Sequence, residues 1–499
     1  MKCRIWMWMT AVCLLAALAM PVWTAAQDNP SQAHKPKHQR YKLIDLGTFG
    51  GPNSQVNGGP PPTINNEGTV AGLAETSTPC PYVDGLMVSP AFKWRDGVLT
   101  NLGLLPNGCF SLPNAINAKG MMVGSGDIGI IDPQTGQPEI RADFRYRGQI
   151  INMGTFGGTN SLANSINSRG QATGGAENTD PDPWDFAALL ELFGPTAWHG
   201  FIWQNGVLRD LGTLGGPDSF GIVINEQGQV VGHSFTNNTP NPTTGIPTLD
   251  PFLWQDGRMT DVGTLGGTFG FGNAVNNHGQ VVGFSDLAGD LTDHPFFWDR
   301  GVLTDIGTLG GENASANWIN DAGQVVGSAM LPDGTHHAFV WRNGTMTDLG
   351  TVNGDGCSNG NYINSRGQVA GTSTDCHGNI LHAYLWENGS MIDLSAQVLP
   401  GSGFAFVEPI VINDVGEIVA NGVMPNGDVH VVVLKPDGDC DTACELSIAA
   451  SASIMPRSFV KQNSMTALQE APVHSFLDRV RSQIRQHYHL PGQLSAPTR

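Results

Sequence analysis

Basic side chains are scarce in this sequence. Its 499 residues include 25 Lys and Arg against 44 Asp and Glu, which gives a formal net charge of −19, and charged residues make up only 14% of the chain. A chain this acidic repels phosphate groups, so we expect no nucleic acid and no anionic membrane surface among its partners. The acidity alone indicates no specific partner.

Long hydrophobic runs and familiar catalytic motifs are also missing. After residue 26 no segment approaches 18 unbroken apolar residues, so the mature chain is predicted to have no membrane span. No Gly-x-Ser-x-Gly, His-Glu-x-x-His or Cys-x-x-Cys occurs. The acidic loops at 437–441 and 286–293 lack the full EF-hand ligand pattern. We therefore predict no catalytic residue, no metal site and no cofactor.

Glycine and proline are abundant instead. The chain has 65 Gly and 32 Pro, which is too many for a mainly helical protein, and no Gly-X-Y period, which excludes collagen. The 12 Trp argue against disorder, because disordered segments are poor in large apolar groups. This composition favours a turn-rich, folded chain.

The N-terminus resembles an export signal. Lys2 and Arg4 precede an apolar stretch from Trp8 to Met20, and the small residues Thr24-Ala25-Ala26 follow it. This order predicts a signal peptide at 1–26 that is cleaved, and a linker at 27–40. The alternative is an uncleaved anchor, because the apolar stretch 5–23 is nearly long enough to span a bilayer. We expect an exported protein, extracellular or periplasmic.

An internal repeat dominates the rest of the chain. An Ile-Asn-type dipeptide recurs, and its asparagines are Asn65, Asn117, Asn167, Asn225, Asn276, Asn320, Asn364 and Asn413. Each unit contains four short β-like runs: run a (337–341 in one unit), run b (346–350), run c (361–364) and run d (368–373). The connection Asn-x-x-Gly between runs c and d predicts a tight turn, in which the Asn bonds its own backbone rather than a ligand.

The order of the runs at the two termini favours a closed ring. The first unit begins at run b, near 41–47, and the last copy of run a stands alone at 430–434. Pairing these two runs would complete one four-stranded blade from both ends and remove exposed edges. We therefore predict an all-β, eight-bladed β-propeller of four-stranded blades over 41–444. Fewer blades or a β-solenoid are the alternatives, and either run a or run c could be innermost.

The repeats resemble a known family. Run a reads His337-Ala338-Phe339 in one unit and His382-Ala383-Tyr384 in the next, and the Asp-Leu-Gly-Thr-Leu-Gly-Gly and Ile-Asn…Gly-Gln-Val-Val-Gly runs recur in a fixed order. Residues 41–436 thus resemble the bacterial HAF repeat family, whose name stands for His-Ala-Phe. The resemblance implies export and a repeat architecture, but no reaction. The recurrence of His, Trp and Asp in successive units favours a structural role for them, because an enzyme site is normally asymmetric.

One face of the predicted ring gathers the variable loops. Connections b–c and d–a share a face and contain every long insertion, so this loop face is the predicted binding surface. The insertion 180–198 reads as a short helix with an apolar stripe, and it is either a lid over the channel or a cap on an exposed edge. The candidate binding residues are Trp184, Phe186, Leu190 and Phe193.

Six cysteines remain after residue 26. An even number in an exported chain suggests disulfides. Cys357 and Cys376 flank one c–d hairpin, Cys80 and Cys109 occupy corresponding places in neighbouring units, and Cys440 and Cys444 follow the last run. We expect these three pairs to be disulfides.

The C-terminal segment 445–499 breaks the repeat pattern. It reads as a linker followed by a short amphipathic helix within 472–490, either docked or frayed. Taken together, the sequence predicts an exported, monomeric, non-enzymatic module that binds protein or glycan at the bacterial cell envelope. The alternative is a secreted hydrolase or lyase acting on polysaccharide or peptide, which would need one asymmetric carboxylate cluster in the channel.

Overall fold

The protein is described here from a computed structural model. The structure describes residues 39–58, 61–133, 135–184, 196–242 and 244–439, and they belong to one compact unit. In these ranges the chain forms strands β1 to β32 and one short helix, α2 (Leu394–Val398). The predicted signal peptide and most of the predicted linker after it, the insertion helix, Cys440, Cys444 and the C-terminal tail lie outside the described residues.

The strands form seven hydrogen-bonded sheets in the described ranges, six with four strands and one with eight. The four-stranded sheets are β2 to β5 (Gly50–Gln55, Val70–Thr76, Ala91–Arg95, Val98–Gly103), β6 to β9 (Ser111–Ile116, Met122–Ile131, Pro138–Tyr146, Gln149–Asn152), β10 to β13 (Ser161–Ile166, Ala172–Pro181, Thr196–Gln204, Val207–Asp210), β22 to β25 (Ala314–Ile319, Val325–Met330, His336–Arg342, Thr345–Gly350), β26 to β29 (Cys357–Ile363, Val369–Thr374, Ile380–Glu387, Ser390–Asp393), and β1 (Gln39–Asp45) with β30 to β32 (Phe406–Ile412, Ile418–Val423, Val429–Asp439). The eight-stranded sheet is β14 to β21 (Ser219–Ile224, Val230–Phe235, Leu249–Gln255, Arg258–Asp261, Gly266–Val275, Val281–Leu287, Asp293–Asp299, Val302–Asp305).

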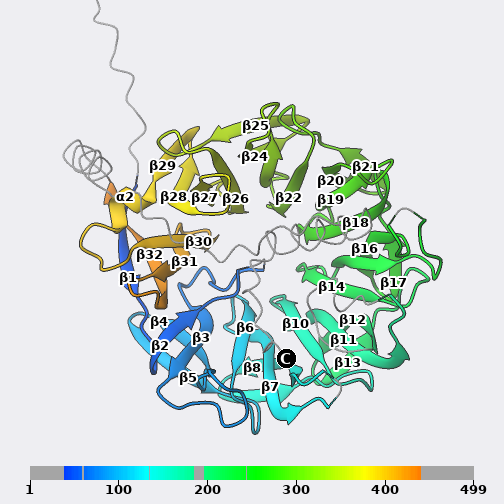
Figure 1. Cartoon of the computed structure of the whole chain (residues 1–499), viewed down its shortest axis with the longest axis horizontal. Coiled ribbons are helices and arrows are strands. Elements are labelled where there is room, and N and C mark those ends of the chain that lie inside the picture. Colours follow the sequence, from blue (N-terminus) through cyan, green and yellow to red (C-terminus); the bar gives the residue numbers. More distant parts are fainter. Residues whose placement is uncertain (1–38, 59–60, 134, 185–195, 243, 440–499) are drawn as a thin grey trace, which may run out of the picture. The chain divides into compact units, whose positions relative to one another are not determined.

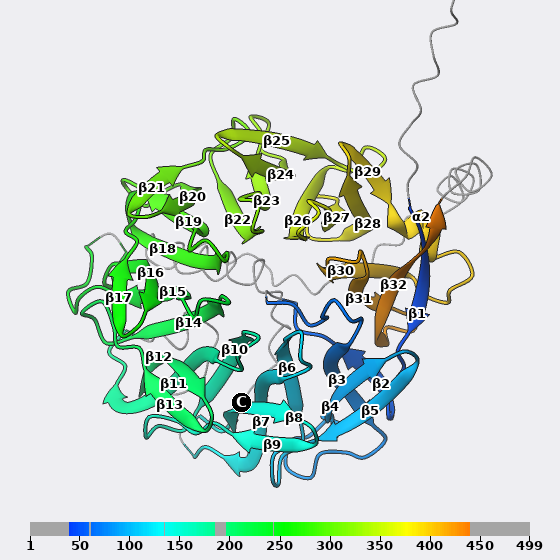
Figure 2. The ribbon, with the colours of Figure 1, turned by 180° about the vertical axis from the view of Figure 1, so that it is seen from behind.

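The sheets surround a central channel as in a β-propeller (Figures 1 and 2). Each four-strand set is antiparallel in the order c, d, a, b, and run c lies nearest the channel (Figure 2). The four predicted runs per unit are thus confirmed, and run c is the innermost strand. The eight-stranded sheet holds two such sets, β14 to β17 and β18 to β21, joined by one parallel pair between Leu249 and Phe269.

The ring closes through its two ends, as the offset of the runs predicted. Strand β1 pairs antiparallel with β32, with Leu43 opposite Leu434 and Asp45 opposite Val432. His430 Nδ1 lies 3.0 Å from the Asp45 carboxylate across this pair. The N-terminal strand is therefore the outermost strand of the last sheet, and it completes that sheet from 385 residues away.

Glycines sit where the turns and a close approach require them. In the a–b turn, Asn343 and Gly344 have φ of 50° and 82°, which suits the tight hairpin predicted there. In the c–d turn, Gly367 has a φ of 77° and its amide donates to the Asn364 carbonyl at 3.0 Å. In run d, a Cβ on Gly327 would lie 1.9 Å from the Ser315 carbonyl oxygen, so only glycine fits.

Strand β8 departs from the repeat in its core positions. Met122 pairs with Arg145, as Val325 pairs with Trp341 in the sheet of β22 to β25. Arg145 therefore occupies the place that a tryptophan has in β24. Asp143, at 1% exposure, likewise replaces a phenylalanine and forms a buried ion pair with Arg145, at 3%.

Two of the predicted disulfides are present. Cys80 joins Cys109, with Cα atoms 5.6 Å apart, and Cys357 joins Cys376, with Cα atoms 5.1 Å apart. The first links the connection after β3 to the connection before β6 in the next sheet, and the second closes the β26–β27 hairpin. Disulfides point to an oxidising compartment. Across the described ranges, no helix is both long and apolar enough to cross a bilayer.

Candidate functional site

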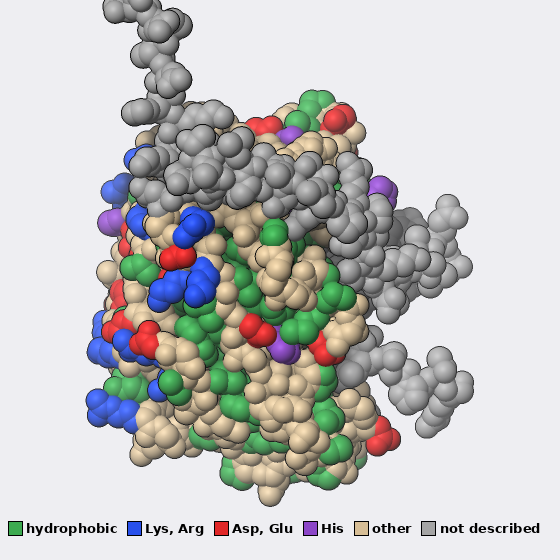
Figure 3. Space-filling view, turned by 90° about the vertical axis from the view of Figure 1, so that its left-hand side faces the viewer, with side chains coloured by type: hydrophobic (Ala, Val, Ile, Leu, Met, Phe, Trp, Pro, Cys, Tyr) green, Lys and Arg blue, Asp and Glu red, His purple; other side chains and the backbone are tan. Residues whose placement is uncertain are grey.

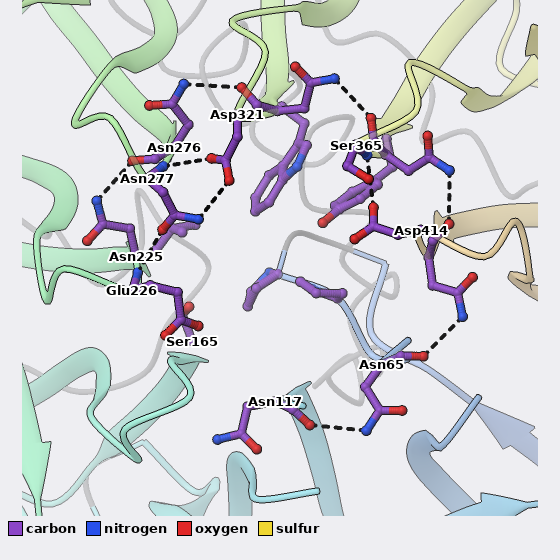
Figure 4. Close-up of a pocket in the computed structure, with 18 of the residues that line it drawn as sticks. Asn65, Asn117, Ser165, Asn225, Glu226, Asn276, Asn277, Asp321, Ser365 and Asp414 are labelled. Atoms are coloured by element: carbon purple, nitrogen blue, oxygen red, sulfur yellow. Dashed lines mark hydrogen bonds between the residues drawn. The ribbon is translucent and has the colours of Figure 1, made fainter. Parts of the chain in front are cut away.

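A pocket opens where the c–d turns of all units converge at the mouth of the channel (Figure 4). Its volume is about 330 Å³, and each unit contributes the end of its run c, with an aliphatic residue in the wall and polar residues at the rim. The size lies within the usual range for small-ligand sites. The pocket is on the face opposite the loop face, because the c–d turns and the d–a connections are at opposite ends of the strands.

A closed ring of buried asparagines forms the frame of this mouth. In every unit the asparagine of the Ile-Asn dipeptide donates its Nδ2 hydrogen to the backbone carbonyl of the corresponding asparagine in the next unit, at 2.8–3.1 Å. The last bond, from Asn413 to Asn65, joins the end of the chain to its start. These bonds connect the innermost strands of adjacent sheets, whose inner edges have no strand partner.

The same asparagines also build the turns. Each Oδ1 accepts the amides of the residues two and four positions later, as in Asn364 with Arg366 and Gln368, both at 3.0 Å. The predicted turn role is thus confirmed. The bond to the neighbouring unit was not predicted. The sequence spacing identifies the asparagine as a turn residue, but it does not show which acceptor its Nδ2 group meets.

The residue after each ring asparagine forms a polar rim (Figure 4). At this place three units carry a carboxylate, namely Glu226, Asp321 and Asp414, and most of the others carry Asn or Ser. Each carboxylate accepts the backbone amide of the preceding unit, for example Asn277 to Asp321 at 2.9 Å and Ser365 to Asp414 at 2.9 Å. The rim is therefore charged and irregular around the ring.

The pocket contains one aromatic pair that is not repeated. Trp318 and Tyr362 come from adjacent units, and their rings stack with centroids 4.7 Å apart and an interplanar angle of 25°. Both are partly exposed. At the same place the other six units have small or aliphatic residues: Thr63, Ala115, Ser165, Val223, Ala274 and Val411. Neither ring takes part in the hydrogen bonds of the frame or of the turns, and the inner side of each ring packs against the hydrophobic core of the adjacent sheets.

The carboxylates of the rim affect the ionisation of Tyr362 in this pair. Burial raises the pKa of the Tyr362 phenol, and the carboxylates of Asp414 and Asp321 raise it further. Burial also favours the neutral form of Asp414, but hydrogen bonds from Ser365 and Asn66, together with Arg366, hold the pKa of this carboxyl below its ordinary value. Asp414 is therefore ionised at neutral pH and lies near the aromatic pair.

A short proline insertion completes the pocket. Run c of the first complete unit has five more residues between its serine and its ring asparagine than run c of the next unit, and Pro61 and Pro62 from this segment line the cavity. The Pro62 carbonyl accepts the Ile116 amide at 3.2 Å, which fixes the segment against the neighbouring unit. Sequence reasoning missed this segment, although the longer spacing between Ser54 and Asn65 was a visible signal.

Of the predicted loop-face residues, only Trp184 is described. It is partly buried and packs against the core of the neighbouring sheets. Phe186, Leu190 and Phe193 lie outside the described residues, so the loop-face binding surface stays a prediction. Among the described residues, no group of three or more His, Cys, Asp or Glu is arranged to hold a metal ion.

The recurrent histidines of run a are bonded to aspartates of run b. His199, His294 and His337 each place Nδ1 2.7–2.9 Å from a carboxylate oxygen of Asp210, Asp305 and Asp348. Burial lowers the pKa of His199, but Asp210 outweighs it and raises the pKa above its ordinary value. These pairs join neighbouring strands on the outer side of the sheets, as expected for a structural role.

Near Trp184 the loop face contains a buried carboxyl with an altered pKa. Asp218 is fully buried, its Oδ1 accepts the Trp198 amide at 2.8 Å, and its Oδ2 has no hydrogen-bond partner in the described part of the chain. Burial, followed by the charge of Asp182, raises the pKa of Asp218 to about 8. A folded pKa above the unfolded value means that stability is greatest below about pH 4 and declines as the pH rises toward 8.

We expect Asp218→Asn to remove this decline, because the amide oxygen still accepts from Trp198 and cannot ionise. Relative to the parent, the variant should melt about 2–5 °C higher at pH 9 and show a smaller difference at pH 5. Thermal unfolding between pH 5 and pH 9 measures this, with the exposed Asp96→Asn as the matched control. A variant that parallels the parent at every pH would show that Asp218 is ionised in the folded state.

No model of a known protein family and no curated protein matches the sequence. Solved structures with a similar fold include the β-propeller domain of the Trilobed protease from Pyrococcus furiosus (10% identity, 68% of this chain and 96% of that chain, TM-score 0.40). They also include Trypanosoma rangeli sialidase in complex with the inhibitor DANA (10%, 72% and 59%, 0.30) and a mutant of the Aleuria aurantia lectin in complex with Fucalpha1-6GlcNAc (10%, 65% and 93%, 0.27).

Proposed function

We propose that this chain is an exported, monomeric propeller that binds protein or glycan at the bacterial cell envelope or outside the cell, without catalysing a reaction. The N-terminal export signal, the resemblance to HAF repeats and the two disulfides support its export. The observation that carries the binding function is the Trp318–Tyr362 pair, an aromatic surface in the pocket that only two adjacent units carry.

We propose that the ring has eight blades. The eight-stranded sheet consists of two complete four-strand sets with one parallel pair between them. The asparagine frame supports the same count, because it contains one residue from each unit and closes after eight bonds.

Outside the pocket, the described residues on the side of the ring drawn in Figure 3 form no large patch of one kind of side chain. On the side of the ring in Figure 3, hydrophobic, acidic and basic side chains are interspersed. Among the well-exposed large hydrophobic side chains, Val98, Val207 and Val302 are single residues on outer strands, and Ile130 and Ile131 are adjacent at the end of β7. Single exposed hydrophobics are normal on a protein surface and indicate no partner.

A hydrolase or lyase is the second candidate, because Glu226, Asp321 and Asp414 do form an irregular set of carboxylates at the channel mouth. A general acid at neutral pH needs a raised pKa. The pKa of Asp414 is instead lowered, and all three carboxylates are used as acceptors for backbone amides. These features favour binding over catalysis.

The test is a panel of glycans, peptidoglycan fragments and peptides, with binding and product release measured together. We expect binding without products, and we expect Trp318→Ala with Tyr362→Ala to weaken it by about tenfold or more, since each aromatic contact contributes on the order of 1 kcal/mol. Val302→Ala is the matched control on an outer strand. Product release that survives purification and disappears in Asp321→Asn would establish the enzyme instead.

A further inference from the structure

We propose that the pocket binds an alkylammonium group, such as a lysine side chain or a quaternary amine, between the Trp318–Tyr362 pair and the carboxylates of Asp321 and Asp414. This inference rests on the binding function proposed above and names the chemistry of the ligand. It combines a cavity of about 330 Å³, an aromatic pair and a lining whose charged residues are all carboxylates.

The charge of the lining has one sign. The residues around the cavity include three carboxylates and, in the described part of the chain, no Lys, Arg or His. Arg366 is close enough to Asp414 to lower its pKa, but it does not line the cavity. A concave site with carboxylates and apolar walls focuses a negative potential and attracts cations. This potential reaches Tyr362, because the carboxylates of Asp414 and Asp321 both raise the pKa of its phenol.

The aromatic pair supplies the second element of such a site. An ammonium group over the face of Trp or Tyr is attracted by the electrons of the ring, and more strongly where water is partly excluded. Trp318 and Tyr362 are partly exposed, and the aliphatic residue before each ring asparagine forms apolar wall around them. Pro61 and Pro62 also line the cavity and add apolar surface for the alkyl part of a ligand.

The hydrogen bonds of the rim favour a cation over a neutral sugar. Asp414 accepts Ser365 N on Oδ1 and Asn66 Nδ2 on Oδ2, both at 2.9 Å. Asp321 accepts the backbone amide and the side-chain amide of Asn277 in the same way. The carboxylate oxygens to which a sugar hydroxyl would donate therefore already accept hydrogen bonds from these amides. The charge of each carboxylate remains, and it attracts a cation without a particular bond direction.

The experiment uses two probes of equal shape, choline and 3,3-dimethyl-1-butanol, which differ in the positive charge. Isothermal titration of the mature chain should show choline binding about tenfold tighter or more, with a preference that shrinks as salt is raised from about 20 to about 300 mM. Trp318→Ala should weaken both probes. Asp321→Asn combined with Asp414→Asn should remove most of the preference and retain binding of the neutral probe. Melting curves verify folding, and Val302→Ala is the control.

The outcomes separate this inference from the proposed function. Equal affinity for the two probes, or binding of neutral glycans with no binding of choline, would overturn the ammonium site and leave the binding module intact. If neither probe binds and no glycan or peptide binds, both the ammonium site and the proposed binding function are overturned. Binding of N-acetyl-lysine methylamide, compared with its norleucine analogue, shows whether a protein side chain supplies the ammonium group.

Discussion

Deletion of Gln39–Asp45 is expected to abolish the cooperative unfolding transition of the native ring, or to lower its melting temperature by about 10 °C or more. The deletion removes β1, the outermost strand of the last sheet. It leaves β32 with unpaired backbone groups and removes Tyr41, which is 4% exposed and packs in the core beside α2. Tyr41 also donates its hydroxyl hydrogen to the Gly416 carbonyl at 3.1 Å.

Circular dichroism during thermal unfolding measures the effect, and a peptide of residues 38–47 added in trans provides the control. The peptide should restore part of the lost stability by pairing with β32, whereas the same peptide with Tyr41→Asp and Leu43→Asp should not. A deletion variant that melts within about 2 °C of the parent would contradict closure through this strand.

The second large effect is expected at the buried ion pair of β8. Arg145 Nε donates to Asp143 Oδ1 at 3.0 Å, and its guanidinium also bonds the Ser111 hydroxyl and the Leu102 and Gly103 carbonyls. Arg145→Met leaves Asp143 charged at 1% exposure, and breaking such a pair costs about 3–5 kcal/mol.

The double variant Asp143→Phe with Arg145→Trp is the matched comparison. It restores the two residues found at the same places in β24, namely Phe339 and Trp341, and removes both charges together. Replacing a buried pair with packed apolar groups is often neutral or stabilising, so we expect stability within about 1 kcal/mol of the parent or above it. Urea unfolding measures both variants. A double variant as unstable as Arg145→Met would show that packing in this sheet depends on the ion pair.

Much of the ring could be predicted from the sequence because its determinants are local and repeated. Short runs of aromatic and β-branched residues between Gly, Asn and Asp predicted the four strands of each unit. The Asn-x-x-Gly spacing predicted the turns, and the extra run at each terminus predicted the closure. The pair Cys357–Cys376 was predictable because its cysteines flank one c–d hairpin, and Cys80–Cys109 because its cysteines lie in neighbouring units on the same face. Each of these depends on the position of a residue within its own unit.

The pocket could not be predicted, because it depends on what adjacent units bring together. Trp318 and Tyr362 read as strand residues until run c is known to be innermost, and only then do they face the channel mouth. The long insertions led to the prediction of a binding surface on the loop face, whereas the pocket lies on the opposite face, where the connections are short.

The asparagine frame has a consequence for how such a chain could diversify. Every amide in the frame reaches the next unit through a backbone carbonyl, which is present whatever side chain stands there. The bond itself therefore sets no requirement on the side chain of the residue whose carbonyl it meets. Adjacent units still have to fit each other through the core that they share, for example where Val282 packs with Phe339 and Trp341. Within that limit, a single unit can acquire a residue such as Trp318 while the circle of bonds stays closed.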